Sequence, residues 1–278
     1  MSTEDESEAA RPDRPSAPGP MAAAVEILSM IEREPGRSAL YLDIDGTLLD
    51  IAPTPEAIVV PPELPNQLAE LAAKLDGAVA LVTGRSIARV DALLQPHLFP
   101  VAGLHGAEMR LPDGRFIEAT VSADFLAVKE ELHARAESLE GVVFEDKGAA
   151  IALHYRLAPY RKAEVDALME EAAVSTGGGW ILQQGKMVVE LKPVQSGKGR
   201  ALEEFMSIAP FRGRRPIAIG DDLTDEGMFA VATAAGGVAI RIGDDAAPTA
   251  ARARLGSPTE LRRLLASVAC RPPGNGHG

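Results

Sequence analysis

The stretch Ser38-Ala39-Leu40-Tyr41-Leu42-Asp43-Ile44-Asp45-Gly46-Thr47-Leu48 passes from an apolar run to two carboxylates within a few residues. The apolar run is typical of a buried strand in a parallel sheet. In open α/β sheets, ligands bind just beyond the carboxyl ends of the strands. We therefore expect Asp43 and Asp45 to lie at such an end, beside a functional site.

On either side of this stretch, the chain follows the strand–helix–strand order of a parallel sheet. Apolar strands are predicted at 78–82, 99–102, 216–219 and 237–240, and helices at 21–34, 65–75, 198–207 and 258–268. Five prolines between residues 50 and 65 exclude a long helix there and predict a loop over the site. The predicted fold class is therefore α/β, with a Rossmann-like parallel-sheet core.

Residues 107–193 show antiparallel signals instead, and they predict an inserted α+β domain. Hairpin turns are predicted at 112–115 and 184–186, strands at 142–145 and 149–155, and helices at 122–139 and 160–174. The predicted core is then discontinuous, at 21–106 and 194–270. Residues 1–20, rich in Pro, Ser and charge, are expected to form a disordered tail, and 271–278 a flexible one.

Composition and charge narrow the class of protein. The net charge of −12 over 278 residues argues against nucleic acid or an anionic membrane as the main partner. No stretch approaches the ~20 apolar residues that cross a bilayer. The acidic amino terminus lacks the pattern of a signal peptide, and the single Cys270 permits no intrachain disulfide. We expect a soluble cytoplasmic protein.

Asp43 and Asp45 are the first candidates for chemistry. A strand-end turn explains single aspartates there equally well. An EF-hand loop is excluded, because aligning Gly46 on the glycine of that motif puts Tyr41 at the first ligand position and Ala52 at the last. Since like charges raise a carboxyl pKa, we expect the two aspartates to share one proton.

Thr83 and Lys198 also stand where a strand ends or a helix starts. The sequence Thr83-Gly84-Arg85 offers a hydroxyl and backbone amides to an anion, although ordinary helix capping explains it as well. Lys198 does not belong to a nucleotide-binding P-loop, because that motif needs Gly at position 192 and Ser or Thr at 199, where this chain has Lys192 and Gly199.

An acidic cluster, Asp221, Asp222 and Asp225, follows the predicted strand 216–219. Favourable interaction with a helix dipole is one explanation. Adjacent aspartates repel each other, however, and a hard cation with oxygen ligands would remove the repulsion. The combined set of two aspartates, a hydroxyl, a lysine and a cation site matches the needs of phosphoryl transfer.

This set of motifs resembles the haloacid-dehalogenase (HAD)-type phosphatases, which share a DxDGT strand end, a Thr/Ser motif, a Lys motif and an acidic motif. The inserted domain is similar to the C2-type α+β cap of that superfamily, in its C2B form. Within that superfamily, the chain looks most like the trehalose-6-phosphate phosphatases, on the evidence of segments 45–49, 82–85, 103–108, 185–193 and 220–229.

The resemblance implies a catalytic role for each motif. Asp43 would attack phosphorus and form an aspartyl-phosphate, and Asp45 would protonate the departing sugar oxygen and later take a proton from water. Thr83 and Lys198 would hold the phosphoryl oxygens. Mg²⁺ would be bound by a larger set of groups, which are Asp43, the backbone carbonyl of Asp45, Asp221 and, as outer or alternate ligands, Asp222 and Asp225.

The resemblance also implies substrate-binding residues. Lys186 and Glu190 match the family's Gly-Lys-x-x-x-Glu sugar-binding motif, and Arg85 follows the phosphate-binding Thr83. Lys147, His154 and Arg156 are plausible neighbours, although a solvated strand face explains them equally well. We expect His105 to be structural, because the mechanism leaves no proton for it.

The implied activity is Mg²⁺-dependent hydrolysis of trehalose 6-phosphate to trehalose and phosphate, the last step of trehalose biosynthesis, with a separate synthase supplying the substrate. Alternatives are a phosphatase of the same branch acting on sucrose phosphate or a glycosyl-phosphoglycerate, a mutase, and a non-catalytic sugar-phosphate sensor. The core motifs do not separate the sugar phosphates, and the cap turn with Lys186 and Glu190 does.

Overall fold

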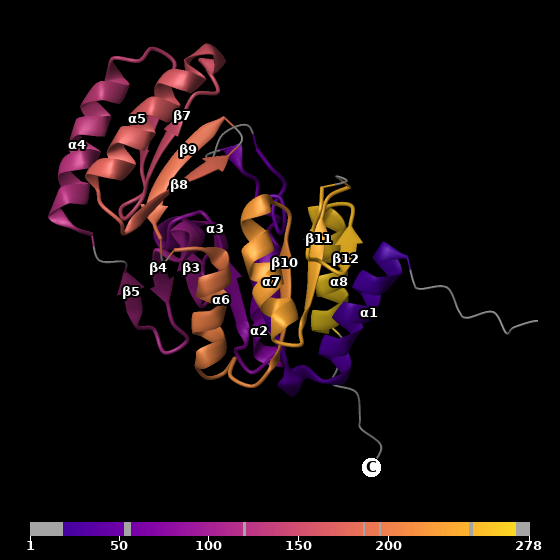
Figure 1. The fold of residues 1–278 in the computed structure, drawn as a ribbon. Coiled ribbons are helices and arrows are strands. Elements are labelled where there is room, and N and C mark those ends of the chain that lie inside the picture. The colour runs from indigo at the N-terminus through magenta and orange to yellow at the C-terminus, as the bar shows by residue number, and fades with distance from the viewer. Residues whose placement is uncertain are drawn as a thin grey trace, which may run out of the picture.

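The computed structural model describes residues 19–52, 57–118, 121–185, 187–194, 196–244 and 247–270. Most of the two predicted tails lies outside these residues. The chain forms an eight-stranded, mostly parallel sheet and a separate four-stranded antiparallel sheet. Figure 1 shows the smaller sheet, with two helices, above one end of the larger unit. The predicted α/β class with an inserted α+β unit is confirmed.

The larger sheet has the strand order β12-β11-β10-β1-β2-β3-β4-β5. The opening stretch forms its central strand β1, which pairs in parallel with β10 on one side and β2 on the other. Every residue of β1 is buried, as a parallel sheet covered on both faces requires. The strands are β1 (Ser38–Leu42), β2 (Val79–Val82), β3 (Val101–Gly103), β4 (Glu108–Arg110), β5 (Phe116–Glu118), β10 (Arg215–Gly220), β11 (Val238–Ile242) and β12 (Ala253–Leu255).

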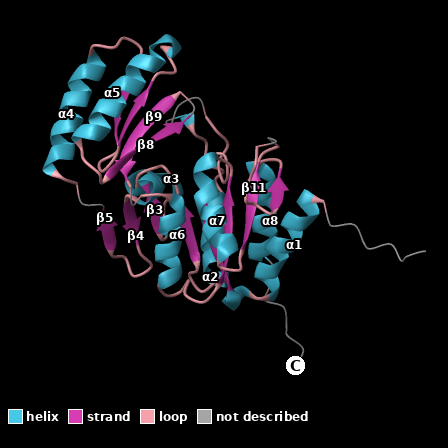
Figure 2. Cartoon of the chain, in the orientation of Figure 1, coloured by secondary structure: helices cyan, strands magenta, loops and turns pink. Residues whose placement is uncertain are grey.

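Helices cover both faces of this sheet (Figure 2). Helices α6 (Lys198–Ser207) and α7 (Glu226–Ala234) pack on one face. On the other face lie α1 (Pro20–Arg33), α2 (Leu64–Lys74) and α8 (Pro258–Cys270), while α3 (Ile87–Leu94) packs near β3 and β4. In the described part of the chain, none of the helices combines the length and the apolar character needed to cross a membrane.

An aromatic cluster fixes α6 against β1. The ring of Tyr41 on β1 lies 5.4 Å from that of Phe211 and 6.5 Å from that of Phe205 on α6. All three side chains are fully buried, so they exclude water from the joint between strand and helix. Because Asp43 follows β1 and Lys198 begins α6, this packing brings the two residues together.

Residues 107–118 were predicted in the cap, and this assignment is wrong. β4 pairs antiparallel with β3, and β5 with β4, so both strands extend the larger sheet. A tight hairpin adds antiparallel strands to the edge of a parallel sheet without a crossover connection. The short strand β12 was not predicted either. The inserted unit begins after this hairpin, and we call residues 121–193 the cap.

The cap sheet has the order β6-β7-β9-β8, with helices α4 and α5 on one face. Val189 and Leu191 of β9 pack toward these helices in the cap core. Because side chains alternate along a strand, Glu190 and Lys192 project from the opposite face, which is turned toward the larger unit. The elements are α4 (Ala123–Glu137), β6 (Val143–Asp146), β7 (Ile151–His154), α5 (Lys162–Ser175), β8 (Trp180–Gly185) and β9 (Val188–Pro193).

Candidate active site

Asp43 lies directly beyond the carboxyl end of β1 and is 3% exposed. Its backbone N–H donates to the carbonyl oxygen of Ile219 on the neighbouring strand, at 2.9 Å. Its Oδ1 accepts a hydrogen bond from Lys198 Nζ at 2.6 Å, and its Oδ2 accepts one from Thr47 Oγ1 at 3.1 Å. The carboxylate that the sequence predicts as nucleophile is therefore buried and held in one orientation.

Lys198, the first residue of α6, is shared by two buried carboxylates. Its Nζ donates to Asp43 Oδ1 and, at 2.7 Å, to Asp225 Oδ1. The amino terminus of a helix disfavours a positive charge, so the carboxylates must supply the compensation. Burial lowers the pKa of Lys198, but the charges and hydrogen bonds of Asp43 and Asp225 outweigh burial, and the net pKa is raised. The charged ammonium form is therefore favoured.

Asp225 organises the turn that follows β10. Its Oδ2 accepts hydrogen bonds from the backbone N–H groups of Asp221 and Asp222, both at 3.0 Å, and its side chain is fully buried. A Cβ at Gly220 would lie 2.2 Å from the Asp225 carboxyl carbon, so only glycine fits there. Both oxygens of Asp225 are thus already engaged by the protein.

Asp222 caps the turn that follows β10. It is exposed, and its Oδ1 accepts a hydrogen bond from the Leu223 backbone N–H at 2.6 Å, so it caps the short turn. The carboxylates that gather with Asp43 are Asp221 and Asp225, whose ligand atoms all lie within 4.8 Å of one another. The predicted role of Asp222 as an outer metal ligand stays a prediction.

The three gathered carboxylates fit a hard divalent cation. Burial, together with the charge of Asp225, raises the pKa of Asp221 to about 6. Burial likewise raises the pKa of Asp43, against the opposing charge of Lys198. Such crowding favours binding of a cation with oxygen ligands. Gly46, at φ +78°, lets the main chain approach the group, because a Cβ there would lie 2.1 Å from Asp221 Oδ2.

Asp45 differs from Asp43 in its hydrogen-bond partner and in its exposure. Arg85 Nε and Nη2 donate to its two carboxylate oxygens at 2.7 and 2.8 Å, and the Asp45 side chain is 39% exposed, against 5% for that of Asp43. The expected shared proton is not supported, because the carboxylates that raise the pKa of Asp43 are Asp225 and Asp221. Arg85, predicted to bind substrate, holds Asp45 in this structure.

Thr83 and His105 form the adjoining loop. Thr83 is fully buried, and its hydroxyl accepts a hydrogen bond from the Arg85 backbone N–H at 3.2 Å. His105, at φ +55°, donates its backbone N–H to the Thr83 carbonyl at 2.9 Å. Burial lowers the pKa of the His105 imidazole well below its usual value, and three nearby lysines lower it further. A neutral, largely buried ring agrees with the expected structural role.

In the cap, Glu190 is 5% exposed and turned toward the core. Its Oε2 accepts a hydrogen bond from Lys147 Nζ at 3.0 Å, while its buried Oε1 has no partner among the described residues. Lys186 lies outside the described residues. Lys147 is therefore the partner of Glu190 on this face of the cap. In the sequence, the only sign of this role was a lysine at the turn between β6 and β7.

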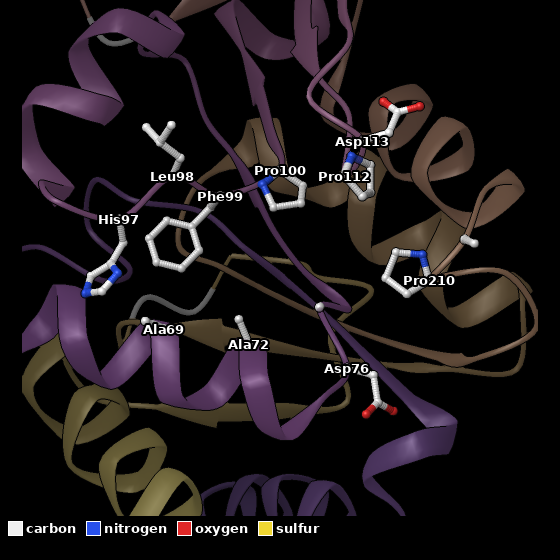
Figure 3. A pocket seen from close by; sticks show the side chains of 12 residues that line it. Ala69, Ala72, Asp76, His97, Leu98, Phe99, Pro100, Pro112, Asp113 and Pro210 are labelled. Atoms are coloured by element: carbon white, nitrogen blue, oxygen red, sulfur yellow. The ribbon is translucent and has the colours of Figure 1, made fainter.

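A cavity of about 630 Å³ lies away from these residues, at the end of the larger sheet where its parallel strands begin. Figure 3 shows its lining, which includes Ala72, Phe99 and Pro210. These three residues come before β2, β3 and β10 in the chain. Asp43, Thr83 and Asp221 instead come directly after parallel strands. None of the predicted site residues lines this cavity, so its size does not mark the site.

Comparisons with known proteins agree with the site. The sequence profile of the family described as trehalose-phosphatase matches residues 41–258. The chain is 50% identical over 244 residues to a probable trehalose-phosphate phosphatase of Sinorhizobium fredii, covering 88% of this chain and 92% of that protein. It is 45% identical over 211 residues to the trehalose-6-phosphate phosphatase of Escherichia coli K12, covering 75% and 78%.

The fold is also found among solved structures. A phosphatase of the haloalkanoate (HAD) enzyme superfamily from Bacteroides thetaiotaomicron superposes with a TM-score of 0.57 at 18% identity, over 83% of this chain and 94% of that one. At this identity the likeness supports the fold alone. It matches the predicted combination of a parallel-sheet core with an inserted cap.

Substitutions should distinguish the buried, ion-paired Asp225 from the exposed, turn-capping Asp222. Asp225→Asn should lower the free energy of unfolding by about 3 kcal/mol, because it breaks a buried ion pair with Lys198. Asp222→Asn should cost less than ~0.5 kcal/mol, because asparagine caps equally well at an exposed position. Urea denaturation of the two variants measures both values. Equal losses would show that Asp225 does not organise the turn.

Proposed function

The chain belongs to the trehalose-phosphatase family, and from this premise we propose that it hydrolyses trehalose 6-phosphate through an aspartyl-phosphate on Asp43, with Mg²⁺ as cofactor. The observation that carries the proposal is the buried Asp43 carboxylate, fixed by Lys198 and Thr47 beside Asp221 and Asp225. A carboxyl oxygen held in one orientation at a strand end is what an attack on phosphorus needs.

In the first step, an oxygen of Asp43 forms a bond to phosphorus while the bond from phosphorus to the sugar oxygen breaks. We assign to Asp45 the proton given to that leaving oxygen, which requires its carboxyl to be protonated and therefore its ion pair with Arg85 to open. In the second step, water attacks the phosphoryl group, Asp45 takes a proton from the water, and Asp43 is released. The different burial of the two aspartates supports this division of roles.

Lys198 and Thr83 support the same reaction from the side of the phosphoryl oxygens. The ammonium of Lys198 already lies against Asp43, so it is placed to neutralise charge on a phosphoryl group attached there. Thr83 follows β2, the strand beside β1, and brings a hydroxyl to the same edge of the sheet.

The acidic cluster supports the choice of Mg²⁺. We expect Asp43, the backbone carbonyl of Asp45 and Asp221 to hold the ion, because both oxygens of Asp225 are engaged by the protein. Asp222 remains a proposed outer ligand. When bound, Mg²⁺ supplies positive charge that offsets the negative charge of the phosphoryl oxygens. Asp225 positions Lys198 and the turn that carries Asp221.

Selection of the sugar is assigned to the cap face. Oε1 of Glu190, which has no partner among the residues described, can accept a hydrogen bond from a sugar hydroxyl, and Lys186 and Arg85 stay predicted contributors. The proposed setting is the last step of trehalose biosynthesis in the cytoplasm, with a separate synthase as the source of substrate. Sucrose phosphate and a glycosyl-phosphoglycerate are the alternative substrates.

Phosphate release from a panel of sugar phosphates tests the activity. With Mg²⁺, trehalose 6-phosphate should be preferred over glucose 6-phosphate and sucrose phosphate, and EDTA should abolish release. Asp43→Asn should also abolish turnover while leaving the circular dichroism spectrum unchanged, because the amide has no charged oxygen to attack phosphorus. A preference for another sugar phosphate would contradict the substrate, and near-normal turnover of Asp43→Asn would remove it as nucleophile.

Glu190→Gln tests the assignment of sugar recognition to the cap. The amide keeps the shape but weakens acceptance from sugar hydroxyls and from Lys147, so kcat/KM for trehalose 6-phosphate should fall about tenfold or more. Hydrolysis of para-nitrophenyl phosphate, which has no sugar, should change less than about twofold. Equal losses on both substrates would place Glu190 outside sugar recognition.

The binding of Mg²⁺ should depend on pH in a stated direction. Because the folded pKa of Asp221 is about 6, above its usual value of 3.8, the metal-free folded chain holds a proton that the unfolded chain loses between these values. The contribution of the Asp221 carboxyl to the stability of the metal-free chain therefore falls as pH rises from about 3.8 to about 6. Mg²⁺ competes with the proton for this carboxyl. The rise in Tm on adding Mg²⁺ should be larger at about pH 7.5 than at about pH 5. An equal rise at both pH values would contradict this.

A further inference from the structure

Lys192 lies on β9, two residues beyond Glu190, on the strand face turned toward the core. The intervening Leu191 packs into the cap core, which fixes the direction of its neighbours. Lys192 pairs in register with Ile181 of β8 and is 6% exposed. A lysine buried to this degree on a sheet is unusual and needs a compensating interaction.

Lys192 forms no ion pair and no hydrogen bond through its side chain with the residues that the structure describes. The two other lysines of this region are compensated, Lys198 by Asp43 and Asp225, and Lys147 by Glu190. Burial lowers the pKa of Lys192, with the charge of Glu190 opposing. The residue therefore carries a desolvation cost that the charge of Glu190 offsets only in part.

The surroundings of Lys192 place it between the two halves of the site. Its charge, after those of Lys198 and Lys147, lowers the pKa of His105, which is bonded to the Thr83 carbonyl in the core. Glu190, on the same strand face, is the residue assigned to the sugar. Lys192 is thus positioned where the sugar-binding face of the cap meets the phosphoryl site of the core.

We propose that Lys192 binds the phosphoester group of the substrate, donating a hydrogen bond from Nζ to a non-bridging phosphoryl oxygen. The phosphate is the only charged part of a sugar phosphate, and an anion is the partner that best offsets a buried ammonium. When the phosphate is removed, Lys192 loses its partner and the neutral sugar is held less tightly. Lys192 is thus a specificity-determining residue that separates substrate from product.

This inference rests on the proposed function for the identity of the sugar, but not for the charge that Lys192 recognises. The experiment therefore uses inorganic phosphate and trehalose as separate competitive inhibitors. In Lys192→Gln, the Ki for inorganic phosphate and the KM for trehalose 6-phosphate should each rise about tenfold. The Ki for trehalose should change less than about twofold, because no charge is lost from its binding.

Stability and two further variants complete the test. Lys192→Gln should have a Tm equal to or above that of the wild type, because it removes a buried charge that forms no ion pair and is only partly offset by Glu190. Lys192→Arg should restore part of the phosphate affinity. Lys162→Gln is the matched control, since that lysine lies exposed on α5 and pairs with Asp166; it should leave both inhibition constants unchanged.

Unchanged phosphate inhibition in Lys192→Gln, equal rises for phosphate and trehalose, or a lowered Tm or loss of folding would overturn the proposal in favour of a structural role. Failure of the proposed function looks different. In that case the wild-type enzyme prefers another sugar phosphate, while inhibition by inorganic phosphate still distinguishes Lys192→Gln from the wild type.

Discussion

The shared ammonium of Lys198 is the interaction on which the active site depends. It joins Asp43 at the end of β1 to Asp225 in the turn after β10, and it belongs to a third element, α6. Removing the ammonium would leave two carboxylates buried without compensation, at a cost of several kcal/mol. The aromatic packing of Tyr41 also holds β1 and α6 together. The site is thus preorganised by the core itself, before any substrate arrives.

The charges of the core and those of the cap are arranged differently. In the core, each buried charge of this network has a partner within the protein, which fixes geometry but offers little to a ligand. On the cap face, Oε1 of Glu190 has no partner among the described residues, and the charge of Glu190 offsets the burial of Lys192 only in part. Unsatisfied groups of this kind lower stability, and they persist where a ligand supplies the missing interaction. This contrast assigns the chemistry to the core and recognition to the cap.

Much of this could be predicted from sequence, because the signals were local. Asp43, Asp45, Thr83 and Lys198 each stand where an apolar run ends or a helix begins, and the topology of a parallel sheet then brings them to one edge. The choice between Asp222 and Asp225 was not predictable, since both lie within one turn, and the direction of each side chain depends on how the loop closes over Gly220. The hairpin 108–118 was misplaced because its own pattern is antiparallel, and only its pairing with β3 shows which sheet it joins.

The position of Lys192 was partly predictable from the sequence, although its burial was not. In the sequence it served only to exclude a nucleotide-binding loop, while the alternation of Val189 and Leu191 with Glu190 and Lys192 was already visible. Alternation assigns Lys192 to the face of Glu190, but its burial depends on the core lying opposite that face, which no local pattern contains. A phosphorylated sugar that spans the two units would meet Glu190 through its hydroxyls and Lys192 through its charge. The same substrate therefore completes the electrostatics of the cap and delivers its phosphorus to Asp43.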